Sequence, residues 1–129
     1  MLKTAMQEGL SKTGAEGDGP GALRKRLDEA VVLQATVAQL RKDLREEALE
    51  LPEVGEGAFE ELRTQVFAVI QMREQEGAHA FGLVVNRVDL TEQQVHAAEA
   101  AGGMHGLAGA VVLRCLQKVL SRMRYAGLG

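Results

Sequence analysis

Apolar residues recur at spacings of three and four along most of this chain, which is the pattern of one face of an α-helix. The longest such run follows a glycine-rich segment that ends at Gly21. Its apolar positions fall alternately on a and d of a heptad: Ala30, Leu33, Val37, Leu40 and Leu44. Pro52 disfavours helical geometry at Leu51 and so ends the run. The pattern predicts one continuous helix over 22–51.

A second run with the same spacing covers 58–76. Because the connection between the two runs is short, they are expected to lie antiparallel as a long, coiled-coil-like helical hairpin. The first helix would be about 45 Å long at 1.5 Å per residue. A globule of this chain length is only about 36 Å across. Part of the first apolar stripe should therefore extend beyond the cover of its own chain.

An uncovered stripe of this kind predicts assembly. We expect the chain to form a homo-oligomer or to bind another protein chain. The residues expected to make these contacts are Leu33, Val37, Leu40 and Leu44. The alternative for each of them is a place in the core of its own chain.

The C-terminal part of the chain predicts one strand and two helices. The segment 79–90 contains Gly82 and several β-branched residues, which favours a short strand or extended segment over a helix. Thr91 and Gln94 have the spacing of a capping box at the start of a helix over 91–102, with Leu90 and Val95 as its hydrophobic staple. An amphipathic, basic helix is expected over 104–126.

Before these elements, residues 1–21 predict a short N-terminal helix and a flexible linker. Residues 22–129 are expected to form a single, mainly α domain. The chain has 129 residues, of which 46% are hydrophobic and 26% charged, and this composition is typical of a soluble globular protein. It contains no apolar run long enough for a membrane helix, no visible secretory signal and a single cysteine, so we expect a cytoplasmic or otherwise intracellular protein that does not bind membranes.

The charge is unevenly distributed. No acidic residue follows Glu99, and four basic residues give the remaining segment a charge of +4 against a net charge of −3 for the whole chain. These residues are Arg114, Lys118, Arg122 and Arg124. One interpretation is a solvated face or attraction to the acidic stretch 46–61. The other is contact with an anionic partner such as nucleic acid. Gly103-Met104-His105-Gly106 is similar to the GxxG loop with which KH domains hold a nucleic-acid backbone, although it contains no Lys or Arg.

Two features could carry other chemistry. Glu92, His96 and Glu99 share one face of the predicted helix over 91–102 and are candidate ligands for a transition metal, with an exposed polar face as the alternative. Cys115 lies among valines and is expected to be a buried thiol rather than a nucleophile. No motif identifies a family, a cofactor or a catalytic set. The sequence therefore favours a non-enzymatic assembly subunit, with a nucleic-acid-binding protein and a small metal-binding protein or enzyme as alternatives.

Overall fold

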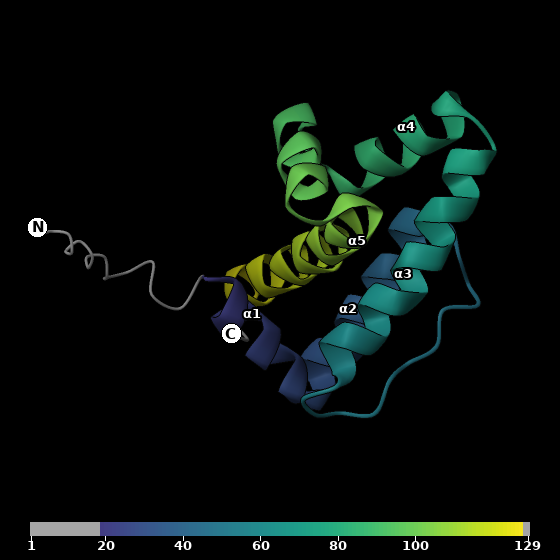
Figure 1. Cartoon of the computed structure of the whole chain (residues 1–129). Coiled ribbons are helices and arrows are strands. Elements are labelled where there is room, and N and C mark those ends of the chain that lie inside the picture. The colour runs from purple at the N-terminus through teal and green to yellow at the C-terminus, as the bar shows by residue number, and fades with distance from the viewer. Residues whose placement is uncertain (1–18, 128–129) are drawn as a thin grey trace, which may run out of the picture.

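The computed structural model describes residues 19–127, apart from the side chain of Pro20. Over this range the chain is mainly helical, as the sequence predicts. The elements are α1 (Pro20–Lys25), the short 3-10 helix η2 (Arg26–Asp28), α2 (Ala30–Leu44), α3 (Ala58–Gln75), α4 (Ala78–Val88) and α5 (Glu92–Tyr125) (Figure 1). The described range contains no strand. The short helix and most of the linker expected over 1–21 lie outside the described residues.

The core forms around α5, which makes extensive contacts with both α2 and α3. Those two helices contact each other far less than either contacts α5. The apolar stripe of α2 is therefore covered mainly by α5, and not by α3 as the second arm of a hairpin. One buried cluster unites side chains from all the helices. Its largest fully buried members include Leu27, Leu33, Leu40, Leu44, Leu62, Ile70, Leu107 and Leu116.

The predicted helix over 22–51 is broken near its start. Backbone at Glu29 is extended, with φ −94° and ψ 121°, and separates η2 from α2. The break allows Leu27, on one side of it, and Leu33, on the other, to be fully buried in the same cluster. A straight rod longer than the globule would have left part of its stripe in water, and the turn avoids that cost.

The same helix also ends earlier than predicted, at Leu44 rather than near Leu51. Arg45 takes the left-handed conformation with φ 55°, and the N–H of Glu46 donates to the carbonyl of Arg41 at 3.0 Å, which is a Schellman termination. The residues that follow are rich in glutamate, and negative charge is unfavourable at the negative end of a helix dipole. The Schellman termination and the unfavourable charge together end the helix at Leu44, before Pro52.

The connection over 45–57 is held to the helices by arginine and glutamine side chains. Arg41 donates two hydrogen bonds to the carbonyl of Leu49, and Arg73 of α3 donates to the carbonyl of Arg45. Gln65 exchanges hydrogen bonds with the backbone of Glu50 in both directions. The connection is therefore fixed along α3, which it accompanies in Figure 1.

The strand expected over 79–90 is not found, because α4 occupies Ala78–Val88. Val84 and Val88 are buried one helical turn apart, and Phe81 and Val85 pack beside them. The segment thus has a helical stripe that packing can use, and the described chain offers no strand with which an extended segment could pair. Packing of that stripe has overridden the β preference of its valines.

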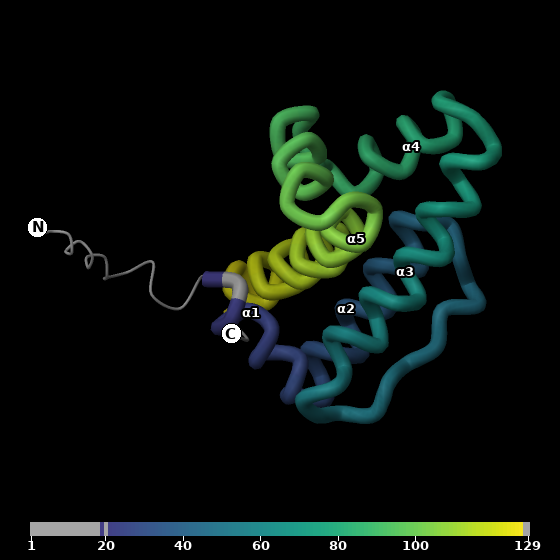
Figure 2. Tube along the Cα trace, viewed as in Figure 1, coloured from purple at the N-terminus to yellow at the C-terminus, as the bar shows by residue number. Residues whose placement is uncertain are grey.

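Helix α5 consists of two arms. Gly102 and Gly103 have non-helical backbone, and Gly103 has φ 63° with ψ −146°, a conformation that strongly favours glycine. We call Glu92–Ala101 the first arm and Met104–Tyr125 the second arm. The tube in Figure 2 shows the change of direction between them. Within residues 19–127, no helix combines the length and apolar character required to cross a bilayer.

Candidate functional site

An open groove of about 440 Å³ lies between α4 and the first arm of α5. The two helical segments that line it lie at the end of the molecule away from α1 (Figure 1). The apolar part of its lining comes from Phe81, Val85, Leu90 and Val95. Gly82, Asn86, Glu92, His96 and Glu99 complete it. The groove is hereafter called the α4–α5 groove.

Local sequence signals position the first arm beside α4. The Thr91 hydroxyl accepts a hydrogen bond from the N–H of Gln94 at 3.0 Å, and the Gln94 side chain accepts from the N–H of Thr91 at 2.9 Å. The predicted capping box is therefore confirmed. Leu90 and Val95, which the sequence assigns to a hydrophobic staple, both line the groove. The signal that starts the helix thus also supplies part of the apolar lining.

Both ends of the first arm are tied to the second arm. At its start, Arg114 forms an ion pair of 2.9 Å with Asp89 and donates to the Asp89 carbonyl at 3.2 Å. At its end, where the chain changes direction at the two glycines, the arms approach so closely that a Cβ on Gly106 would collide with the carbonyl oxygen of Ala98. These contacts set the orientation of the first arm, and with it the shape of the groove.

The rim of the groove is acidic. Glu92 and Glu99 lie seven residues apart on the first arm, and neither forms an ion pair with any residue of the described range. From Val88 to Leu113 the sequence contains three acidic residues and no Lys or Arg. Arg87 belongs to α4 but does not line the groove, so Glu92 and Glu99 give its rim negative charge.

The metal-ligand candidates Glu92, His96 and Glu99 all line this groove, as their shared helix face suggests. They are not close enough together to coordinate one ion, since no group of three His, Cys, Asp or Glu within residues 19–127 could hold a metal. The lining contains no Ser, Thr, Cys or Lys that could act as a nucleophile. The chain matches no protein-family model, no curated protein and no solved structure. What the groove offers chemically is an apolar surface with acidic edges.

Three of the four basic residues that were predicted to contact an anionic partner bond to residues of their own chain. Arg114 pairs with Asp89, and Arg122 donates to the Gln39 side chain at 2.8 Å. Lys118 forms an ion pair of 2.8 Å with Asp43 and also donates to a backbone carbonyl of α4. Arg124 lies beside Leu23 and Leu120 near the C-terminal end of α5. The basic side chains of α5 thus mainly fasten the helices to one another.

Asp43 is the centre of a buried polar cluster that the sequence did not single out. Its carboxylate is stabilised among apolar residues because the side chains of Gln39, Lys118 and Cys115 all donate hydrogen bonds to it. Burial, and then the negative charge of Asp43, raise the pKa of the Cys115 thiol well above its ordinary range. The thiol therefore stays protonated, in agreement with the buried structural role expected from its apolar neighbours.

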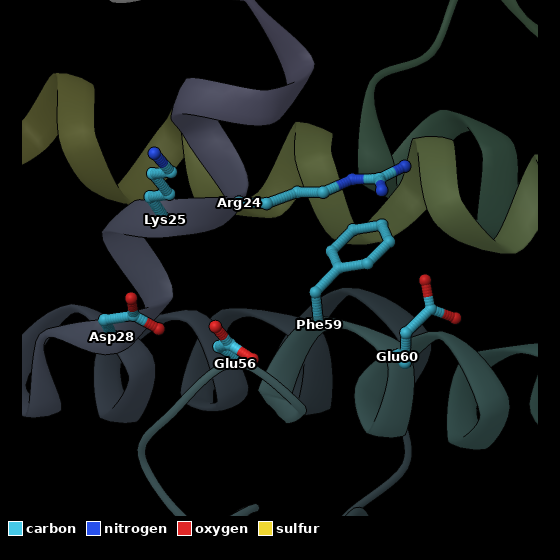
Figure 3. A pocket seen from close by; sticks show the side chains of 6 residues that line it. All are labelled: Arg24, Lys25, Asp28, Glu56, Phe59 and Glu60. Atoms are coloured by element: carbon cyan, nitrogen blue, oxygen red, sulfur yellow. The ribbon is translucent and has the colours of Figure 1, made fainter.

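A second, smaller pocket of about 190 Å³ lies between α1 and the start of α3 (Figure 3). The Arg24 guanidinium lies over the Phe59 ring, 4.2 Å from its centroid. Lys25 and Arg24 share the lining with three carboxylates, from Asp28, Glu56 and Glu60. Basic and acidic groups are therefore mixed in this lining, with one more carboxylate than cation. The stacked arginine closes the seam between α1 and α3.

The assembly residues predicted from the heptad lie in the core. Leu33, Val37, Leu40 and Leu44 are each no more than 1% exposed. The sequence predicted that these residues form an apolar stripe, but not that α5 packs against it and buries it. Conversely, the strand interpretation concealed that Phe81 and Val85 share a helix face. Their spacing of four residues is the signal that could have revealed it.

Proposed function

We propose that this chain is a non-enzymatic interaction subunit that binds a segment of another polypeptide chain in the α4–α5 groove. The observation that carries the proposal is the incomplete cover of one apolar surface. The side chains of Phe81, Val85 and Leu90 are only partly buried, although they pack against the core. Apolar surface that meets in a concave site is the usual basis of ligand and peptide binding.

This function is of the class that the sequence favours, a non-enzymatic interaction subunit, but it uses the α4–α5 groove instead of the heptad residues of α2. The heptad residues of α2 are fully covered within one chain, so they offer a partner little surface. In the α4–α5 groove, by contrast, apolar side chains remain accessible between two helices. A second copy of the chain or a different protein could supply the bound segment, and the test below separates these two cases.

Gly82 provides a direct test, because it lies in the groove wall and a Cβ at this position would meet no atom within 4 Å. Gly82→Gln should place a side chain in the groove without disturbing the core. Gly82→Ala is the matched control, since it makes the same backbone change with almost no bulk. Both substitutions should stabilise α4, because glycine in a helix costs about 0.5 to 1 kcal/mol relative to alanine.

The experiment selects binders for the wild-type chain from a displayed library of random peptides about 16 residues long, which spans roughly 24 Å as a helix. Most selected peptides should bind Gly82→Ala as they bind the wild type and should bind Gly82→Gln at least about tenfold more weakly, the effect of losing about 1.4 kcal/mol. Light scattering of the unliganded wild type and of Gly82→Gln reports whether a second copy occupies the groove, because a dimer formed through the groove should be weakened in the variant. Peptides that bind Gly82→Gln as tightly as the wild type would show that the groove is not the binding surface.

A further inference from the structure

We infer that the segment bound in the α4–α5 groove is an amphipathic helix with Lys or Arg along its edges. This inference rests on the proposed function and adds the chemistry of the partner. It follows from two separate features of the groove, which are the secondary structure of its walls and the charge of its rim.

The walls favour a helix over an extended peptide. Both walls are α-helices, whose backbone N–H and C=O groups bond within each helix away from the ends. Unlike the exposed edge of a sheet, they have no row of backbone groups with which an extended segment could pair. A helix satisfies its own backbone and can present an apolar stripe to the groove floor.

The size of the groove agrees with a short run of helix anchors. Its volume of about 440 Å³ is formed along α4 and the first arm, with Phe81 and Val85 on one wall and Val95 on the other. Helices bind such grooves through apolar side chains at positions i, i+3 or i+4, and i+7. We expect the bound helix to contribute two or three such side chains.

The rim selects for positive charge at the edge of that helix. Glu92 and Glu99 are separated by about 10.5 Å along the helix axis, which is seven residues at 1.5 Å each. Basic residues seven positions apart on a roughly parallel or antiparallel partner helix would have the same separation. The nearby acid Asp89 is already paired with Arg114, whereas Glu92 and Glu99 form no ion pair within the described part of the chain. Complementary charge at a rim accelerates association and suppresses wrongly charged partners.

The test compares the composition and the charge dependence of peptides from the same library. Peptides that compete for the groove, as judged by loss of binding to Gly82→Gln, should be enriched in Lys and Arg beside an apolar stripe of helical spacing. They should bind a variant that combines Glu92→Lys and Glu99→Lys about tenfold more weakly, because two attractive pairs become repulsive. Their circular dichroism should show helix in the bound state.

The matched control combines Glu50→Lys with Glu53→Lys, which changes the net charge equally in the connection over 45–57. This control should bind the selected peptides within about twofold of the wild type, since charges beyond a Debye length of about 10 Å are screened at ordinary salt. If groove-directed peptides are neutral or acidic, or if both charge variants bind equally well, the cationic-helix inference is wrong while the groove stands. If Gly82→Gln leaves binding intact, the proposed function itself fails.

Discussion

The two arms of α5 are consecutive in sequence but have opposite relations to the rest of the molecule. The first arm, Glu92–Ala101, buries a single residue, Val95. The second arm, Met104–Tyr125, buries a continuous stripe against α2 and α3. That stripe consists of Leu107, Ala108, Gly109, Val111, Val112, Cys115, Leu116 and Val119. The second arm thus acts as a scaffold, whereas the first arm is held at its ends and leaves a face uncovered.

The difference shows that consecutive helical segments can contribute very unequally to a core. The second arm is fastened along its length by Arg114, Lys118 and Arg122, each bonded to a residue of another segment. The first arm is placed by a capping box and a double glycine, which fix where it starts and where it ends. A surface positioned in this way is suited to binding, because covering or mutating it should cost the core little.

The largest expected difference between the arms is in the cost of removing a buried side chain. Leu116 is completely buried in the second arm, and Leu116→Ala should lower the free energy of unfolding by about 3 to 5 kcal/mol. Val95→Ala, in the first arm, should cost only about 1 kcal/mol because it removes a smaller side chain that is still 8% exposed. Urea unfolding followed by circular dichroism measures both values. Equal losses would mean that the first arm belongs to the same cooperative core.

The ion pairs that hold the two arms should also differ. Asp43 is 7% exposed at its side chain and pairs with Lys118, so Asp43→Asn should cost about 2 to 3 kcal/mol by leaving the partly buried ammonium without its counter-charge. Asp89 is 73% exposed and pairs with Arg114, and Asp89→Asn should cost less than about 1 kcal/mol. Asparagine is tolerated at the left-handed backbone of position 89. Thermal unfolding of both variants tests the contrast, which a comparable loss at the two sites would overturn.

Two glycines, one in α4 and one in the second arm of α5, should respond to alanine with opposite signs. Gly106→Ala forces a Cβ against the carbonyl of Ala98 and should destabilise the chain by about 1 to 3 kcal/mol. Gly82→Ala adds a methyl group into open space within α4 and should stabilise it by about 0.5 to 1 kcal/mol. Chemical denaturation of the two single variants is sufficient. Stabilisation by both would show that the first arm does not approach the second arm as closely as described.

Stability in mild alkali should report the protonated thiol in the second arm. The pKa of Cys115 is raised in the folded state, so the folded chain retains a proton that the unfolded chain releases above about pH 8.5. The contribution of this thiol to the free energy of unfolding is therefore fully present at neutral pH. It falls as the pH rises, by about 1 kcal/mol between about pH 8 and about pH 9.5. Urea unfolding of Cys115→Ala should show a decline smaller by that amount. An identical pH dependence in both proteins would contradict the buried, protonated thiol.

Local signals along the chain were sufficient to predict several parts of this fold. The capping box at Thr91 and the stop at Gly102 depend on neighbouring residues, and both occur in the structure. The break at Glu29 could not be predicted in the same way. It depends on the size of the finished globule and on the need to bury Leu27 and Leu33 together. The early end at Leu44 is intermediate, because its acidic sequence was visible but the arginine contacts from α3 were not.

The groove illustrates the same division. Its polar rim was visible as a helix face with Glu92, His96 and Glu99, and its staple residues were identified as a pair. The opposite wall was missed because the valines of α4 have a strong β preference, and only packing against α2 and α3 decides in favour of a helix. A groove between two elements requires both to be assigned correctly. Sequence reasoning therefore identified half of the site and attributed binding to a stripe that the fold buries.

Amide hydrogen exchange of the chain with and without a saturating selected peptide tests the central claim most directly, because it locates the bound surface without substitution. The account predicts added protection in α4, the turn at Leu90 and the first arm of α5, with little change in α2 and in the second arm beyond its first turns. Protection confined to α2 or to the C-terminal end of α5, with α4 unchanged, would contradict it.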